Sequence, residues 1–192
     1  MEIRMGNARD AEAVRQIYKP IVEQTAISFE LVVPTTEQIA ERITQRQPLH
    51  PWLVVTEADQ VLGYAYAGPF SGRAAYDWSV EASVYLDESV RGKRVGVGLY
   101  TALFGILVAQ GYRRIMAGIT LPNVASVALH EKMGLSQVGV YRSVGWKFDQ
   151  WHDVGWWQGA LRGEGDPTRI RPFTEFDQHH YDALIQAGRA MF

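Results

Sequence analysis

Residues 93–98 read Lys93-Arg94-Val95-Gly96-Val97-Gly98 and join a predicted strand, Trp78 to Leu86, to a predicted apolar helix, Leu99 to Gln110. Two glycines without side chains allow backbone N–H groups to converge at the start of that helix, where the helix dipole favours an anion. The pattern indicates a loop that binds a phosphate or a pyrophosphate. A plain tight turn in front of a core helix stays open as the alternative on glycine spacing alone.

Two known nucleotide-binding motifs fit this loop poorly. A P-loop needs a Lys-Ser or Lys-Thr pair after its second glycine, and neither pair follows Gly98. A dinucleotide-binding loop needs a glycine or alanine at position 101, which is Thr101, and it normally follows the first strand of the fold. The loop pattern therefore predicts that an anion binds here but does not identify the ligand that carries it.

Strands and helices alternate on both sides of this loop. The first predicted helix contains Pro20, which should kink or end it in its last turn. The further predicted elements are the strands Glu2 to Met5, Trp52 to Thr56, Val61 to Ala67, Arg113 to Thr120, Ser136 to Val144 and Asp149 to Leu161, and the helices Asp10 to Gln24, Glu37 to Arg46 and Asn123 to Met133. Antiparallel hairpins come first and a strand–loop–helix–strand unit lies in the middle, which predicts an α/β or α+β sandwich.

The composition excludes several classes of protein. None of the 192 residues is cysteine, so a cysteine nucleophile, a thiolate zinc site and a disulfide scaffold are excluded. The formal charge of −2 gives no electrostatic basis for binding nucleic acid. No apolar run reaches the roughly 18 residues of a membrane-spanning helix, and Met1 to Arg4 lack a signal-peptide pattern. We expect a cytoplasmic protein that contacts neither a membrane nor nucleic acid.

The last part of the chain differs in character. Residues 162–167 combine glycine, charge and proline and are typical of a linker. Beyond them, the apolar residues from Tyr181 to Met191 fall near helical spacing. We expect one domain over residues 1–161 and a C-terminal extension over residues 162–192, helical and docked on that domain or on a dimer partner.

Several segments together resemble one family. Residues 93–98 are similar to the acetyl-CoA pyrophosphate loop of the GNAT acetyltransferases, in which Gln or Arg, two residues, Gly, one residue and Gly or Ala open the central helix. Lys93 stands at the Gln/Arg position and keeps its positive charge. The other segments are Pro51 to Val55, Gly63 to Pro69, Arg73 to Glu81, Leu129 to Gly134, Trp151 to Val154 and Gly155 to Trp157. From about Ile3 to Leu161 the chain resembles the phosphinothricin N-acetyltransferase subfamily.

This resemblance implies a GNAT fold, a central mixed and mostly antiparallel sheet flanked by helices. It implies an enzyme that transfers acetyl from acetyl-CoA, its co-substrate, to the amino group of a small glutamate-like amino acid of the phosphinothricin or methionine sulfoximine type. The transfer would be direct and need no metal, and the protein would be a homodimer. An acetyltransferase for a protein N-terminus or a polyamine is the alternative hypothesis. A non-enzymatic CoA-binding module is the third.

Glu81 is the first candidate for catalysis. It shares a strand face with Ser79, Ser83 and Tyr85, and a carboxylate on a central strand is costly unless it is paired or functional. The strand pattern alone favours a salt-bridged or edge-exposed glutamate. The resemblance implies that Glu81 is the general base, because the amine must lose a proton before its nitrogen can attack.

His130 is the second candidate. His130-Glu131 is half of a zinc-protease motif, but the second histidine is missing because position 134 is Gly134, so no zinc site is expected. A helix histidine with a structural hydrogen bond is the ordinary interpretation. The resemblance implies catalysis, and an imidazole with a usual pKa of about 6.5 can act as acid or as base.

The resemblance also implies the binding residues. Acetyl-CoA would contact the backbone of Val84, Tyr85 and Leu86, the loop residues Lys93, Arg94, Val95, Gly96, Val97 and Gly98, and Asn123, which can also cap its helix. The amino-acid pocket would contain Phe29, Arg73, Tyr76 and Ser83. The guanidinium of Arg73 suits a carboxylate or a phosphinate. Subfamily members often have Thr at position 83, so Ser83 lacks a methyl group there.

Overall fold

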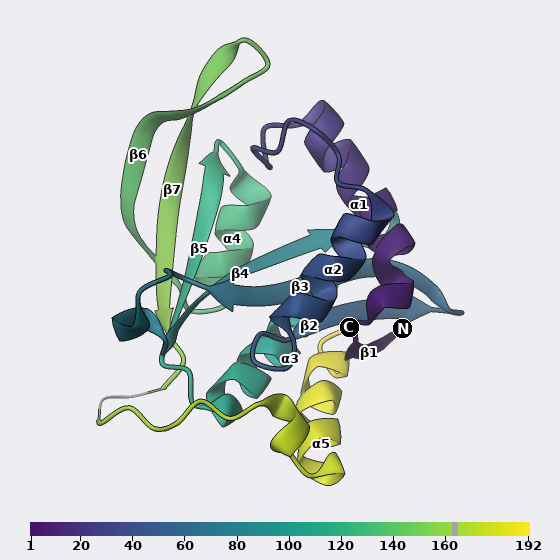
Figure 1. Cartoon of the computed structure of the whole chain (residues 1–192). Helices are drawn as coiled ribbons and strands as arrows, with labels where there is room; N and C mark the ends of the chain where they lie inside the picture. The colour runs from purple at the N-terminus through teal and green to yellow at the C-terminus, as the bar shows by residue number, and fades with distance from the viewer. Residues whose placement is uncertain (163–164) are drawn as a thin grey trace.

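The computed structural model describes residues 1–162 and 165–192 (Figure 1). Gly163 and Glu164, within the predicted linker, lie outside the described residues. In chain order the elements are β1 (Glu2–Met5), η1 (Ala8–Asp10), α1 (Ala11–Gln24), α2 (Thr36–Arg46), β2 (Trp52–Glu57), β3 (Gln60–Pro69), η2 (Ala74–Tyr76), β4 (Ser79–Leu86), η3 (Glu88–Val90), α3 (Val95–Gln110), β5 (Arg114–Leu121), α4 (Val124–Lys132), β6 (Ser136–Lys147), β7 (Gln150–Ala160), η4 (Phe173–Glu175) and α5 (Gln178–Arg189).

The strands form one sheet in the order β1-β2-β3-β4-β5-β7-β6 (Figure 1). Neighbouring strands are antiparallel except β4 and β5, which run parallel. This confirms the predicted α/β (α+β) class with a mixed, mostly antiparallel sheet. The parallel pairing joins residues 79–81 of β4 to residues 114–116 of β5. Beyond Glu81 the two strands separate, so the rest of β4 has no neighbour on that side.

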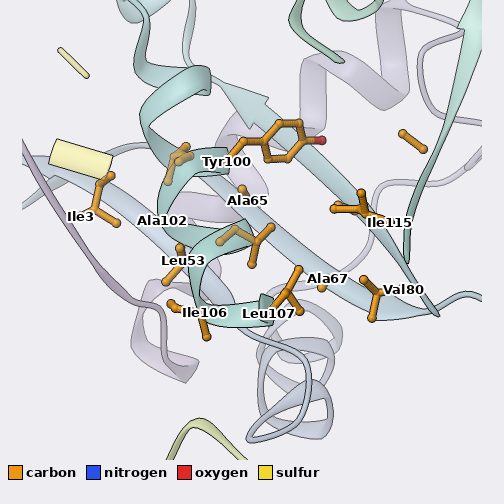
Figure 2. Packing of buried hydrophobic residues seen from close by; sticks show 14 of the residues in the cluster. Ile3, Leu53, Ala65, Ala67, Val80, Tyr100, Ala102, Ile106, Leu107 and Ile115 are labelled. Atoms are coloured by element: carbon orange, nitrogen blue, oxygen red, sulfur yellow. The ribbon is translucent and has the colours of Figure 1, made fainter. Parts of the chain in front are cut away.

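α3 is the central helix because it is apolar around nearly its whole circumference. Of its 16 residues, 11 are buried, as expected for a helix that lies inside the protein. Figure 2 shows Ala102, Ile106 and Leu107 of α3 packed with Leu53 of β2 and Ala67 of β3. No helix among the described residues, α3 included, is both long and apolar enough to cross a membrane.

α1 and α2 cover the opposite face of the sheet. Successive strand residues point to opposite faces, so Trp52 and Val54 of β2 pack with Val14 of α1 and Ile43 of α2. Their neighbour Leu53 points to α3 instead. The sheet therefore separates two apolar layers, and the candidate site lies where its strands part.

α1 ends at Gln24 as predicted and continues through Pro20, because a proline removes only one intrahelical N–H and the burial of the adjacent Ile21 compensates for it. The start of α3 differs from the prediction. α3 begins at Val95 rather than Leu99. The two glycines of the predicted loop are therefore part of the first turn of the helix.

α5 packs along α3 and meets it at a pair of glycines (Figure 1). A Cβ atom on Gly98 would lie 2.7 Å from the carbonyl oxygen of Gly188 and 2.5 Å from the ring of Phe192. The absence of a side chain at both positions allows the helices to approach closely. This tertiary contact explains why Gly98 lies inside a helix despite the low helix propensity of glycine.

Candidate active site

A cavity of about 550 Å³ opens between α1, β4, the start of α3 and α4. This volume is in the usual range for small-molecule and cofactor sites. α1 contributes Ile21 and Gln24, α4 contributes Ala125 and Leu129, and the segment after α1 contributes Ile27. The cavity is thus built from parts of the chain that lie more than 100 residues apart.

The first turn of α3 forms one end of this cavity through Arg94, Val95, Gly96 and Val97. The first N–H groups of a helix have no partner within it, and the intrahelical series begins at Gly98, whose N–H donates to the carbonyl oxygen of Arg94 at 3.0 Å. The unpaired donors and the helix dipole place positive partial charge at the cavity. The geometry suits a phosphate or pyrophosphate group.

Positive side chains surround the same end of the cavity. Arg91, Arg94 and Lys132 all line it. The Nη1 atom of Arg91 lies 3.2 Å from a carboxylate oxygen of Glu88, which also lines the cavity and offsets part of this charge. The charged side chains that line the cavity therefore have a net positive charge, which favours an anionic ligand.

Two residues of the predicted acetyl-CoA loop lie elsewhere. Lys93 is exposed and does not line the cavity. Gly98 packs against α5, on another side of α3. The structure therefore brings only Arg94 to Val97 of this loop into the cavity wall.

A second cavity, of about 50 Å³, lies where β4 and β5 separate. Val84, Tyr85 and Asn123 line both cavities, so the two adjoin. Because β5 no longer pairs with β4 beyond Glu81, backbone N–H and C=O groups on this side of β4 are available to a ligand. Leu86 extends the same strand edge along the larger cavity. A ligand with amide groups can bind to this edge as an additional strand would.

Asn123 caps α4 at the junction of the two cavities. Its Oδ1 atom accepts a hydrogen bond from the backbone N–H of Ser126 at 3.1 Å. The predicted cap is confirmed, and the same side chain borders both cavities.

His130 is buried, with 4% of its surface exposed, and both of its ring nitrogens have partners. Nδ1 lies 2.7 Å from the carbonyl oxygen of Ser126, and a carbonyl can only accept, so Nδ1 carries the proton. Nε2 lies 2.9 Å from the hydroxyl of Tyr100. Burial lowers the pKa of the imidazole, and the hydrogen bond to Ser126 partly opposes this shift. The ring is therefore neutral at pH 7, and Nε2 accepts the hydroxyl proton of Tyr100.

Tyr100 completes this pair from α3 and was missed by sequence reasoning. Its side chain is fully buried, and it lines the smaller cavity together with His130. Burial raises the pKa of the phenol far above its ordinary value of 10.0, and nearby Tyr66 and Glu81 raise it further, so the hydroxyl keeps its proton. The available signal in the sequence was a tyrosine in an otherwise nearly apolar helix.

Glu81 lies half-buried on β4, across from Gly68 of β3. Within residues 1–162 and 165–192 its carboxylate makes neither a hydrogen bond nor an ion pair. Burial raises the pKa of this carboxyl above its ordinary value of 4.5, and the positive charge of Arg46 partly opposes the shift. Glu81 does not line either cavity, but Ser83, two residues along the same strand face, lines the smaller one.

Arg46, at the end of α2, is a second residue that sequence reasoning missed. Its guanidinium lies 4.7 Å from the ring centre of Tyr66, and its Nη1 donates to the carbonyl oxygen of Ala67 at 3.3 Å. A side chain at Gly68 would overlap this guanidinium. The glycine opposite Glu81 thus makes room for a cation beside the carboxylate. No motif marks Arg46, because α2 places it there from another part of the chain.

Arg73 and Tyr76 lie on the exposed segment before β4 and line neither cavity. The ring of Tyr76 meets the ring of Phe70 edge-on, with their centres 5.6 Å apart. Phe70 in turn meets Trp156 at 6.1 Å, and Trp156 lies against Gly118 in the wall of the smaller cavity. A chain of aromatic rings therefore connects this segment to the cavity wall.

Phe29 lies on the segment between α1 and α2 and packs across the β6–β7 hairpin. A side chain at Gly145 of β6 would overlap its ring, and its ring centre lies 6.1 Å from that of His152 on β7. Phe29 itself is 37% exposed and lines neither cavity. Of the four predicted pocket residues, the structure brings only Ser83 into a cavity wall together with His130.

The sequence matches the family described as "Acetyltransferase (GNAT) domain" over residues 3–156. The chain belongs to the GNAT acetyltransferase family. The phosphinothricin N-acetyltransferase of Streptomyces viridochromogenes is 40% identical to this GNAT chain over 177 residues, which are 91% of the chain and 96% of the relative. The L-methionine sulfoximine/L-methionine sulfone acetyltransferase of Pseudomonas aeruginosa is 36% identical over 172 residues, or 88% and 98% of the two proteins.

A solved structure agrees with this assignment. The crystal structure of a GNAT superfamily phosphinothricin acetyltransferase from Sinorhizobium meliloti in complex with acetyl-CoA has a TM-score of 0.83 and 32% identity, and the match covers 90% of this chain and 96% of that one. The predicted GNAT resemblance is confirmed, and this protein is an acetyl-CoA-dependent acetyltransferase. Its larger cavity fits such a co-substrate, with N–H donors and cations for phosphates at one end and a free strand edge beside them. The described residues hold no group of three or more His, Asp or Glu side chains placed to bind a metal ion.

Proposed function

We propose that this GNAT acetyltransferase acetylates the amino group of a small glutamate-like amino acid of the phosphinothricin or methionine sulfoximine type. The observation that carries the proposal is the position of half-buried Glu81 and of the His130–Tyr100 pair at the point where β4 leaves β5. Two relatives whose names include these substrates support it.

The larger cavity would hold the co-substrate, and acetyl-CoA supplies an acetyl thioester that an amine nitrogen can attack directly. The C–N bond then forms, the C–S bond breaks, and CoA leaves as the thiolate. The N–H groups of Val95 to Val97 would bind its pyrophosphate oxygens. The free edge of β4 from Val84 to Leu86, beside Asn123, would bind the amide groups of the pantetheine arm. An N–H of the same edge is suited to bind the thioester oxygen as negative charge develops on it.

Glu81 would take the proton of the incoming ammonium group, directly or through a water molecule. Burial makes its carboxylate a stronger base than that of an exposed glutamate, because burial disfavours the charged form. The positive charge of Arg46 limits this upward shift of the pKa, because it favours the ionised form that accepts the proton.

The His130–Tyr100 pair would act as a second proton acceptor. The Tyr100 hydroxyl donates to Nε2 of His130, so the lone pairs of the phenol oxygen are free to accept a hydrogen bond from the smaller cavity. A proton that leaves the amine can reach neutral His130 through this hydroxyl. In this tautomer Nε2 carries no proton to give, so we assign the base role to His130 in place of the acid role.

The amine substrate would occupy the side of the site that Arg73, Tyr76, Phe29 and Ser83 border. The exposed guanidinium of Arg73 offers two parallel N–H donors to a carboxylate or phosphinate. Ser83 lines the smaller cavity, where the amine nitrogen must approach the thioester. The aromatic rings of Phe29 and Tyr76 would enclose the rest of the molecule.

A homodimer is part of this proposal. The β6–β7 hairpin carries large apolar side chains that are each more than half exposed, namely Val138, Tyr141, Val144, Trp146, Phe148 and Trp151. Exposed apolar patches of this kind mark protein interfaces, and a second copy of the chain would cover it. We also propose an acetyltransferase domain over residues 1–161 with an extension over residues 162–192. The proposed location is the cytoplasm, where acetyl-CoA is available.

A thiol-release assay with acetyl-CoA and a panel of amines tests the substrate. The panel contains phosphinothricin, methionine sulfoximine, methionine sulfone, common amino acids, spermidine and a peptide with a free N-terminus. We expect turnover confined to the glutamate-like analogues. Turnover of only the peptide or spermidine would replace the proposed substrate with the alternative one, and thiol release with none of the amines would favour a CoA-binding module without activity.

A further inference from the structure

Lys147, the last residue of β6, is a buried ammonium group without a carboxylate partner within hydrogen-bond distance among the described residues. Its exposed fraction is 5%. Its Nζ atom donates to two backbone carbonyl oxygens, those of Val22 and Ser28, each at 2.7 Å. The ring of Phe148 lies 5.1 Å away. Burial lowers the pKa of Lys147, and the charge of Glu30 partly opposes the shift.

Both acceptors belong to one short part of the chain, residues 22–30. Val22 lies in the last turn of α1, where the carbonyl groups have no partner within the helix. Ser28 lies on the irregular segment that follows. Lys147 thus donates a hydrogen bond to a carbonyl group at the end of α1, although it lies 125 residues away in sequence. Its second hydrogen bond, to Ser28, attaches the segment after α1 to the same side chain.

Residues 22–30 reach both halves of the candidate site. Thr25 and Ile27 line the larger cavity, and Ile27 also lines the smaller one. Phe29, directly after Ser28, lies on Gly145 of the hairpin. The position of this segment relative to the hairpin therefore sets the distance between Phe29 and the point where β4 and β5 separate.

Other polar contacts hold the segment to α1 and α2, while the ring of Phe29 makes an apolar contact with the hairpin. The hydroxyl of Tyr18 lies 2.6 Å from Oγ of Ser28 and donates to Glu30 at 3.0 Å. Arg42 of α2 pairs with Glu30 at 2.7 Å. Lys147 makes the polar link across to β6. An apolar side chain at position 147 would be buried at a smaller desolvation cost than an ammonium group. The ammonium group therefore contributes its two hydrogen bonds, which hold the carbonyl groups of Val22 and Ser28 in position.

We propose that Lys147 is a positioning residue for the amine pocket, which holds Phe29 in place by fastening residues 22–30 to the end of the β6–β7 hairpin. The inference rests on the proposed function for its effect on the amine substrate. Its mechanical part, the fastening of the segment, does not depend on which amine is acetylated.

The test uses the full chain and the variant Lys147→Met, which keeps the length of the side chain and removes its donors. We expect the KM for the amine to rise about tenfold, because hydrogen bonds to a charged group are lost, while kcat stays within about twofold. The matched control Arg142→Met removes an exposed cation of the same strand, whose partner Asp153 is on β7, and leaves both constants within about twofold.

A double-mutant cycle separates positioning from general destabilisation. If Lys147 acts through Phe29, the KM of Lys147→Met/Phe29→Ala equals that of Phe29→Ala alone. If the factors by which the two single substitutions raise KM multiply in the double variant, Lys147 acts independently of Phe29, and the proposal is overturned. If Lys147→Met does not fold, Lys147→Gln keeps a neutral amide group that can donate hydrogen bonds and should raise KM about threefold. An unchanged KM in that variant also contradicts the proposal.

Hydrogen exchange measured by mass spectrometry provides a readout that needs no substrate. Peptides covering residues 22–30 should exchange about tenfold faster in Lys147→Met than in the wild type, while peptides from α3 keep their rates. Equal exchange in both proteins would overturn the inference. If the wild type acetylates no glutamate-like amine, the proposed function fails, and this measurement still decides the role of Lys147.

Discussion

The two halves of the proposed active site differ in how they are built. The half proposed for acetyl-CoA offers backbone groups from two continuous segments, the first turn of α3 and the edge of β4. The half proposed for the amine offers side chains from separate elements, among them Glu81 of β4, His130 of α4 and Phe29 after α1. One half therefore depends on where the backbone runs, and the other depends on which side chains meet.

This difference has a consequence for specificity. A backbone donor is the same for every residue type except proline, so the first half tolerates substitutions that leave its helix and strand in place. In the second half each side chain supplies a distinct group, and a single substitution removes it. Substitutions should therefore change acetyl-CoA binding slightly and amine turnover strongly, except where they displace α3 itself.

The largest effect should come from Glu81→Gln. The variant keeps the shape of the side chain and loses the base, so kcat/KM for the amine should fall about 100-fold or more at neutral pH. The Kd for acetyl-CoA should stay unchanged, because Glu81 does not line the larger cavity. The control Glu57→Gln removes an exposed carboxylate at the end of β2 that lines neither cavity, and it should leave kcat/KM unchanged. A loss of less than about twofold between about pH 6 and pH 9 would show that Glu81 is not the base.

Gly188→Ala should displace α5 from α3 and thereby shift the first turn of α3. The added methyl group would lie 2.5 Å from the carbonyl oxygen of Gly98 and 2.8 Å from Cβ of Ala102. Overpacking of this kind costs about 1–3 kcal/mol, which lowers Tm by about 2–4 °C per kcal/mol in a chain of this size. We expect a weaker Kd for acetyl-CoA and an unchanged KM for the amine. The control Gly139→Ala, which has open space around the new methyl group, should keep its Tm.

Arg46→Met should change the pH dependence of the amine half. Arg46 opposes the upward shift that burial imposes on the pKa of Glu81, so its removal raises that pKa further. The base is active when it is ionised, above its pKa, and the acid limb of the kcat/KM profile should therefore move to higher pH. Arg9→Met, which removes an exposed cation of η1, should leave the profile in place. A limb that moves to lower pH, or does not move, would contradict this electrostatic role.

The smallest effect should distinguish two adjacent cations. Arg94 lines the larger cavity and Lys93 does not. Arg94→Gln should weaken the binding of acetyl-CoA about two- to fivefold at low salt, as expected for one exposed charge near a helix start, and the difference should shrink as salt is added. Lys93→Gln should bind as the wild type does. Equal losses in both variants would mean that general surface charge, and not the cavity lining, attracts the ligand.

Patterns within a few residues were predicted well. The predicted cap Asn123 is present at the start of α4, and the structure also has a capping box of Thr35 and Gln38 at the start of α2 and a left-handed Gly111 at the end of α3. Each of these depends on hydrogen bonds between residues at most four positions apart, so the residue types alone reveal them. The start of α3 was predicted four residues late, because the burial of Gly98 against α5 cannot be inferred from its neighbours in sequence.

The residues of the proposed amine half were predicted from resemblance, and only the structure shows what surrounds them. The resemblance named Glu81 and His130 but not their neighbours. Arg46 approaches Glu81 from α2, and Tyr100 approaches His130 from α3. These partners decide the direction of each pKa shift and the tautomer of the imidazole, which residue spacing does not encode.

The amino-acid sequence by itself determined the order of helices and strands, their caps, and the family through its motifs, because periodicity and capping act between near neighbours. Only the tertiary structure decided that β4 and β5 part after Glu81, that the Tyr100 hydroxyl donates to His130, and that Lys147 reaches Ser28 across 119 residues of sequence. The physical reason is burial. A polar group that leaves water must find a partner, and which partner lies within about 3 Å depends on how distant segments pack.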